Sequence, residues 1–159
     1  MPTGEVSTTP IVRDALDRGK TVFIPYLHKN DREPGSGPAS VMDMLKLRST
    51  QEFEGLKLDK WGIPTLDDDS IQERDNSLGG KGIEEVRNSN GDGGLDLILM
   101  PGMAFDGNMG RLGHGKGYYD YFLYRYQEAV QAQEVKRAPR QVKPFLGELE
   151  VQLCVGIIS

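Results

Sequence analysis

Apolar and polar positions first follow a helical period and then a strand period. The apolar side chains of residues 9–19 recur on one face of a helix, at Ile11, Val12, Ala15 and Leu16. Thr9 is the expected cap, Pro10 suits the first turn and Gly19 suits the end. The run TVFIPYL, residues 21–27, is β-branched and aromatic and predicts a strand that Pro25 ends or bulges.

Further strands are predicted along the chain. Residues 41–47, VMDMLKL, alternate apolar and polar positions and predict a strand with one wetter face. Residues 60–66 are apolar but broken by glycine and proline, which indicates an ordered loop or a short edge strand. Residues 95–102, LDLILMPG, form the clearest strand, and residues 151–158 form a last strand-like run.

Two segments differ from these strands. Residues 67–94 are rich in Asp, Asn, Gly and Ser, and we expect a long surface insertion that is partly disordered. A helix within IEEVRN, residues 83–88, is the alternative for part of it. Residues 116–133 predict a helix beginning near Lys116 or Gly117, with an apolar side formed by Tyr119, Phe122, Leu123, Tyr126 and Ala129 or Val130.

This order of elements favours an α/β fold with a mostly parallel sheet and flanking helices. Ligands of such sheets bind at the carboxyl ends of strands, where the glycine-rich loop after residues 95–102 lies. The length of 159 residues suits a single domain, residues 1–159, that carries the 67–94 insertion.

Composition narrows the function classes. A net charge of -5 argues against a general nucleic-acid binder, although residues 136–143 are locally basic and are expected to be a solvated linker. The single cysteine, Cys154, allows no internal disulfide and favours a small core residue in a reducing compartment. No apolar run reaches the ~18 residues of a membrane span.

The stretch GRLGHGKGYYD, residues 110–120, is the strongest candidate for chemistry. Its glycines allow positive φ and close backbone approach, and the following helix start favours anions. Arg111 and Lys116 add cations, so the stretch predicts a phosphate cradle. Asp120 lies one helical turn after Lys116 and could bind Mg²⁺ beside phosphates. The alternative is a glycine-rich hairpin whose charges are merely solvated.

Residues 95–123, LDLILMPGMAFDGNMGRLGHGKGYYDYFL, resemble the signature region of the 5-formyltetrahydrofolate cyclo-ligase family. Weaker features agree with it, namely MPTGEVST, FIPYL, MDMLKL and WGIP, so the resemblance covers residues 1 to about 126. It implies a single-domain fold like that of the NagB, RpiA and CoA-transferase proteins. It also implies ATP-dependent closure of 5-formyltetrahydrofolate to 5,10-methenyltetrahydrofolate in one-carbon metabolism, with release of ADP and phosphate.

The resemblance also implies roles for single residues. Arg111 and Lys116 would be catalytic cations, and Asp120 would bind Mg²⁺. The ATP phosphates would be held by Arg111, Leu112, Gly113, His114, Gly115, Lys116, Gly117, Tyr118 and Tyr119. Folate would be contacted by Glu5, Met44, Trp61, His114, Gly115, Lys116, Gly117 and Tyr118, with Met42 beside Met44. Plain core packing is the alternative for both methionines, and loop capping is the favoured role for Asp106.

The sequence departs from the family pattern at both ends. The family's N-terminal basic helix and its C-terminal segment with a second acid have no counterpart, so we expect a weakly active or inactive chain. The rivals are another phosphate-dependent enzyme, a non-catalytic folate or nucleotide binder, and a divergent relative linked to RNA or thiamine. We expect a cytoplasmic monomer without nucleic-acid or membrane partners, with a mitochondrial location as an open alternative.

Overall fold

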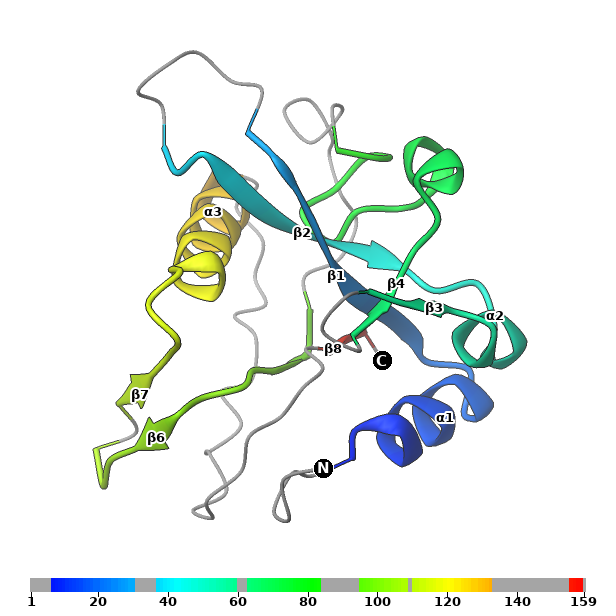
Figure 1. Cartoon of the computed structure of the whole chain (residues 1–159), viewed down its shortest axis with the longest axis horizontal. Coiled ribbons are helices and arrows are strands. Elements are labelled where there is room, and N and C mark those ends of the chain that lie inside the picture. Colours follow the sequence, from blue (N-terminus) through cyan, green and yellow to red (C-terminus); the bar gives the residue numbers. More distant parts are fainter. Residues whose placement is uncertain are drawn as a thin grey trace.

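The computed structural model describes residues 7–30, 37–59, 63–83, 95–108, 110–132 and 155–158. Its helices are α1 (Thr9–Asp17), α2 (Thr50–Glu54), the 3₁₀ helix η1 (Asp68–Glu73) and α3 (Tyr118–Ala132). Its strands are β1 (Thr21–Lys29), β2 (Ser40–Lys46), β3 (Lys57–Leu58), β4 (Pro64–Thr65), β5 (Leu97–Leu99), β6 (Ala104–Phe105), β7 (Arg111–Leu112) and β8 (Val155–Ile158). These elements form a small α/β structure (Figure 1).

Helix α1 is confirmed with nearly the predicted bounds. Pro10 lies in its first turn, but Thr8 rather than Thr9 occupies the N-cap position, without a side-chain capping bond. Gly19 ends the helix with a φ of 72°. The amide of Gly19 bonds Leu16 O and that of Lys20 bonds Ala15 O, both at 2.9 Å. This pair of bonds is a Schellman motif, which fixes the backbone at Lys20.

The main sheet has the strand order β2-β1-β8-β5, and its pairings are all antiparallel among the described residues. The predicted mostly parallel sheet is therefore not what the described strands form. A parallel pair needs a long crossover, whereas β1 and β2 are joined by residues 30–39 and pair as a hairpin. Strand β8 runs between β1 and β5 and opposite to both.

Pro25 does not interrupt β1, so that prediction is wrong. The strand continues to Lys29, and Pro25 lies opposite Met44. Met44 turns its carbonyl away from β1, where it accepts from Ser77 N at 2.9 Å. Pro25 and Met44 therefore form a non-hydrogen-bonded pair, and the ladder to β2 needs no N–H group from the proline.

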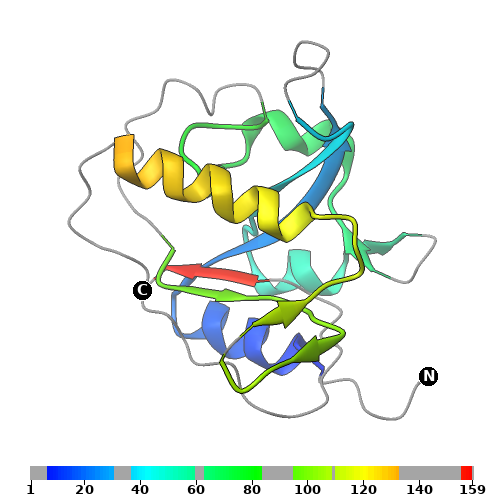
Figure 2. The same cartoon turned by 90° about the vertical axis from the view of Figure 1, so that its left-hand side faces the viewer.

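The sheet lies between α1 and α3, with a packed core on each face (Figure 2). Val12 and Ala15 of α1 pack with Val22, Ile24, Leu45, Leu47, Phe53, Leu66 and Ile71. Phe122 and Tyr126 of α3 pack with Phe23, Met42, Met44, Leu78 and Leu95. Both faces of β2 are covered, since every residue from Val41 to Leu45 is buried. The wetter face predicted for this strand is wrong.

Residues 67–83, the first part of the predicted surface insertion, pack against β2 instead. Ile71, Leu78 and Arg74 are buried at 3%, 5% and 5% exposure. Backbone bonds join Lys46 N to Asp75 O at 3.0 Å and Ser77 N to Met44 O at 2.9 Å. This segment therefore lies along the outer edge of β2 and bonds to its backbone.

Several predictions lie outside the described residues. They are the remainder of the insertion with its alternative helix, the basic linker 136–143, and Cys154. Strand β5 is shorter than the predicted 95–102, and α3 begins at Tyr118 close to the predicted start. Within the described residues, no helix is long and apolar enough to cross a membrane.

Candidate active site at the glycine loop

A small hairpin carries the loop that the sequence singles out. Strands β6 and β7 pair antiparallel, with Phe105 opposite Arg111. The Asp106 carboxylate accepts hydrogen bonds from the amides of Asn108 at 2.8 Å and Gly110 at 2.7 Å. Asp106 therefore closes the tip of the hairpin, which was its favoured role, and the hairpin fixes the start of the glycine loop.

Arg111 is the side chain around which the loop is organised. Its Nη1 donates to Pro101 O at 2.9 Å and its Nη2 donates to Asp120 Oδ1 at 2.8 Å. The guanidinium also lies over the Tyr119 ring, 5.5 Å from the ring centroid. Only 13% of the side chain is exposed. Arg111 thereby ties the end of β5 to the first turn of α3.

The loop between β7 and α3 has the backbone that the glycines predict. Gly115 and Gly117 adopt φ values of 78° and 69°, a region that L side chains rarely occupy. Within the described part of the chain, the amides of residues 113–117 donate no hydrogen bond to another group. These amides precede the first turn of the 15-residue helix α3. Such an arrangement suits an anion.

The predicted ATP-binding residues lie on this continuous segment, but their exposure differs. Leu112, His114, Gly115, Lys116 and Gly117 are exposed, whereas Tyr118 and Tyr119 are half-buried. Lys116 has no ion-pair partner among the described residues. Gly113 is held close to Arg111, since a Cβ there would lie 2.9 Å from Nη1. Lys116 is thus the cation of the loop that is available to a ligand.

Asp120, the predicted magnesium ligand, lies in the first turn of α3. Its side chain is 75% exposed, although one oxygen is held by Arg111. The described residues include no group of three or more His, Cys, Asp or Glu side chains that could hold a metal ion. One exposed carboxylate fits Mg²⁺ that takes its other ligands from phosphate oxygens and water.

The structure separates the predicted folate-binding residues. Met44 is fully buried and Met42 is 2% exposed, both within the core that α3 covers. Both methionines therefore pack in the core of this structure, as the core alternative describes, because both faces of β2 are covered. Contact of Met44 with folate stays a prediction. Glu5 and Trp61 lie outside the described residues.

A buried charged cluster was missed by the sequence analysis. Asp43 of β2 is 1% exposed, and its carboxylate bonds His28 Nε2 and Arg125 Nη2, each at 2.7 Å. Arg125 Nη2 also donates to Met42 O at 2.6 Å. Arg125 therefore caps the outer edge of β2 from α3. The sequence signal for this cluster was Asp43 between two methionines on a predicted strand. The alternation of apolar and polar residues in that strand suggested instead that the Asp43 side chain is solvated.

The cluster lowers the pKa of Asp43. Burial opposes its ionisation, but the hydrogen bond from His28 and the charge and hydrogen bond of Arg125 outweigh it, so the pKa of Asp43 lies below its ordinary value. Arg125 is 9% exposed, and its Nε has no hydrogen-bond partner among the described residues. An unsatisfied buried donor is costly. The cluster thus connects α3 to the sheet through buried charged groups. It thereby helps to set the position of the glycine loop that precedes α3.

Comparison with known proteins places this site in a family. The model of the 5-formyltetrahydrofolate cyclo-ligase family matches residues 1–139. The chain is 36% identical over 132 residues to 5-formyltetrahydrofolate cyclo-ligase of Mus musculus, covering 83% of this chain and 53% of that protein. It is 51% identical over 144 residues to the Saccharomyces cerevisiae protein of the same name, covering 84% and 57%.

A shorter match involves a plant protein whose name includes a compartment. The mitochondrial 5-formyltetrahydrofolate cyclo-ligase of Arabidopsis thaliana is 57% identical over 37 residues, which are 23% of this chain and 13% of that protein. The chain spans about half the length of the mouse and yeast relatives it matches. The family match extends over most of the chain and includes the glycine loop, Arg111, Lys116 and Asp120. The chain belongs to the 5-formyltetrahydrofolate cyclo-ligase family.

Proposed function

We propose that the chain carries the nucleotide-binding part of a cyclo-ligase centre. The reaction converts 5-formyltetrahydrofolate to 5,10-methenyltetrahydrofolate and releases ADP and phosphate from ATP. Family membership supports the folate substrate, and the glycine loop supports the nucleotide. The observation that carries the proposal is Lys116, an exposed cation without an ion-pair partner among the described residues, on a loop with two positive-φ glycines.

In this proposal the loop holds the ATP phosphates through backbone amides and Lys116. The amides of residues 113–117 are not used elsewhere in the described structure. The start of α3 adds the positive end of its dipole. Lys116 stabilises the negative charge of the group being transferred. Arg111 contributes chiefly by holding the loop, because both terminal nitrogens already bond Pro101 and Asp120.

The chemistry of the substrate explains why ATP is needed. A formamide oxygen is a poor leaving group, so water is not readily lost when the ring closes. Phosphate transfer to this oxygen yields an iminium phosphate, and the neighbouring folate nitrogen attacks the activated carbon. The C–O bond then breaks and phosphate departs with the oxygen. Asp120 would hold Mg²⁺, which offsets phosphate charge when bound.

The direct test follows methenyl product by its absorbance in the purified chain with 5-formyltetrahydrofolate, ATP and magnesium. We expect Lys116→Ala to lower the rate by about 100-fold or more, since it removes a charge that acts on the transferring group. Lys57→Ala is the matched control, because Lys57 is an exposed lysine paired with Asp67 on β3. It should leave the rate unchanged.

Other outcomes separate the rival functions. Thermal stabilisation by ATP or folate without product identifies a non-catalytic binder, which is the second candidate. ADP release without methenyl product that Glu5→Gln and Trp61→Ala leave unchanged favours another phosphate-dependent reaction. A folded chain with neither product nor stabilisation contradicts the proposal. Cytoplasmic location and the monomeric state remain parts of this proposal.

A further inference from the structure

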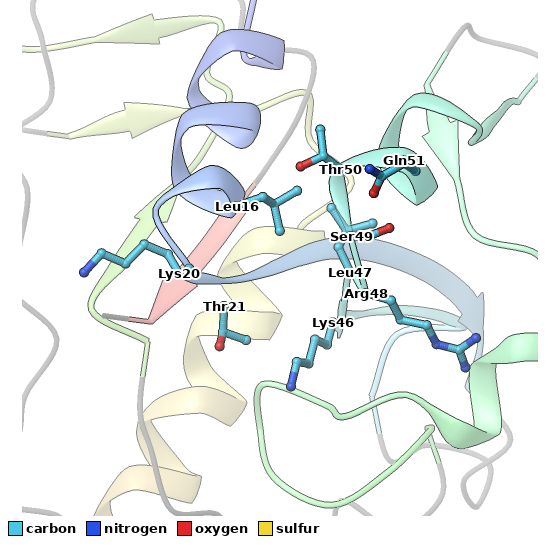
Figure 3. A pocket seen from close by; sticks show the side chains of 10 residues that line it. Leu16, Lys20, Thr21, Lys46, Leu47, Arg48, Ser49, Thr50 and Gln51 are labelled. Atoms are coloured by element: carbon cyan, nitrogen blue, oxygen red, sulfur yellow. The ribbon is translucent and has the colours of Figure 1, made fainter.

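A pocket lies away from the glycine loop, where the end of α1 meets the start of β1 and the end of β2. Its volume is about 340 Å³. Figure 3 shows the lining side chains, which are Leu16, Lys20, Thr21, Lys46, Leu47, Arg48, Ser49, Thr50 and Gln51, with Gly19 completing the wall. Figure 1 places α1 and α2 on the opposite side of the molecule from the β6–β7 hairpin. The pocket is therefore separate from the proposed ATP site.

The lining of this pocket has a charge opposite to that of the chain. Lys20, Lys46 and Arg48 supply three cations, and the described lining residues include no acidic side chain. The chain as a whole carries a net charge of -5. Thr21 and Ser49 add hydroxyl groups, whereas the Thr50 hydroxyl donates to Asp17 at 3.3 Å. A hollow that concentrates cations and hydroxyls on an acidic protein favours an anionic ligand.

The cations stand around the rim and do not converge on one point. In Figure 3 the charged ends of Lys20, Lys46 and Arg48 leave the pocket in different directions. Lys46 pairs with Asp75 at 3.0 Å and Arg48 with Glu73 at 3.3 Å. All four side chains are more than 40% exposed, so each pair contributes little. An anion in the pocket can therefore compete for both cations.

The backbone beneath these side chains is well fixed. The Schellman motif holds Lys20, and the amide of Leu47 bonds Val22 O at 2.8 Å. The Ser49 hydroxyl accepts from Glu52 N at 3.1 Å, and the amide of Arg48 donates to Glu52 at 2.6 Å. Lys20 has no ion pair with the described part of the chain. Binding then costs mainly side-chain ordering, with little rearrangement of the backbone.

We propose that this pocket binds a small oxyanion with at least two negative charges, either a phosphate compound or a polycarboxylate. The charged ends of Lys20, Lys46 and Arg48 would have to turn inward from the rim to contact the anion, and the hydroxyls of Thr21 and Ser49 would donate to it (Figure 3). The pocket volume lies at the lower end of the range of small-molecule sites, which suits a ligand of this size. The proposal is independent of the reaction at the glycine loop.

The test is a nuclear magnetic resonance titration of the chain with pyrophosphate and, separately, with citrate. Lys116→Ala is the background, so that binding at the glycine loop does not contribute. We expect amide shifts confined to residues 19–21 and 46–51 with at least one of the two anions. The stronger of the two identifies the ligand class. Sodium chloride at matched ionic strength should give no such confined shifts.

Substitutions distinguish binding at this specific site from nonspecific electrostatic attraction. Lys20→Met with Arg48→Met should weaken binding by about tenfold or more, because two charge-assisted contacts are lost. Glu73→Gln frees Arg48 and should tighten binding by about two- to fivefold. Lys57→Met, outside the pocket, should change nothing. Shifts absent with both anions, or weakened equally by Lys57→Met, would overturn the proposal.

Discussion

At the scale of single residues, two charged side chains make structural contacts although the sequence predicted ligand binding for one and solvent exposure for the other. Arg111, a predicted phosphate ligand, donates to Pro101 and Asp120 and is mostly buried. Asp43, predicted on a wetter face, is 1% exposed and bonds His28 and Arg125. Burial makes such contacts costly to break, because the remaining partner cannot recover its hydration.

Replacement of the buried carboxylate should therefore destabilise the fold strongly. Asp43→Asn retains the shape but leaves Arg125 without a counter-charge and His28 without its carboxylate partner, and we expect a loss of about 3–5 kcal/mol in the free energy of unfolding. Urea unfolding measures it. Asp67→Asn is the control, since Asp67 forms an exposed pair with Lys57 and should cost under about 1 kcal/mol. Equal losses would contradict this reading of Asp43.

The same variant should change how stability depends on pH. The pKa of Asp43 is lower in the folded chain than its ordinary value, so its contribution is present above that ordinary value. It is lost as pH falls through the folded pKa, when the carboxylate takes up a proton. Wild type should thus lose more stability than Asp43→Asn on acidification below about pH 4. Parallel pH profiles of the two proteins would contradict the assignment.

At the scale of elements, α3 is tied to the rest of the chain in its first turn and near its middle. Arg111 bonds Asp120 in the first turn, while Arg125 caps β2 two turns later. Tyr126 accepts a hydrogen bond from Leu95 N at 2.5 Å, just before β5. Since β5 leads to Pro101, which Arg111 also bonds, the residues on both sides of β5 are tied to α3 or to its preceding loop. These ties set where the loop lies relative to the sheet.

Loss of the Tyr126 tie should be measurable without disturbing the packing. Tyr126→Phe keeps the ring against Phe122 but leaves the buried Leu95 amide without an acceptor, and we expect a loss of about 1–3 kcal/mol. Thermal or urea unfolding measures the change. Tyr124→Phe on the same helix is the matched control, because Tyr124 is 57% exposed. A similar effect of both substitutions would show that the hydroxyl contributes no tie.

At the scale of the whole molecule, the described chain is a sheet covered on both faces, and residues 67–83 complete its edge. Arg74 is the main connection, with bonds to Lys46 O at 2.9 Å and to Glu52 at 2.6 Å. Burial opposes ionisation of Glu52, but Arg74 and the amide of Arg48 hold the pKa of Glu52 below its ordinary value. A polar segment can thus be ordered by tertiary bonds that its composition does not reveal.

Amide hydrogen exchange distinguishes this ordered edge from a surface insertion. We expect slow exchange at Ser77 and Gly82, whose amides donate to Met44 O and Arg74 O at 2.9 and 2.8 Å. Their protection should approach that of Leu47, which bonds β1. His114 and Lys116 in the glycine loop are the internal comparison and should exchange fast. Exchange at Ser77 as fast as at Lys116 would contradict the packed edge.

The sequence by itself determined the elements with strong local patterns. Periodicity and turn residues were sufficient for α1, β1, β2 and α3, because these signals act within a few residues. The glycine loop was likewise predictable, since positive φ at Gly115 and Gly117 is a local property. The motif around it carried the family resemblance, which the comparisons confirm.

The tertiary structure alone decided the partners. Strand directions, the burial of Met44 and Asp43, and the packing of residues 67–83 depend on groups far apart in the chain. The Arg125–Asp43 pair spans 82 positions, and no local period encodes it. Lys20 likewise lines the same pocket as Lys46 and Arg48 only because the chain folds. Local sequence sets backbone preference, whereas burial and charge pairing arise when distant surfaces meet.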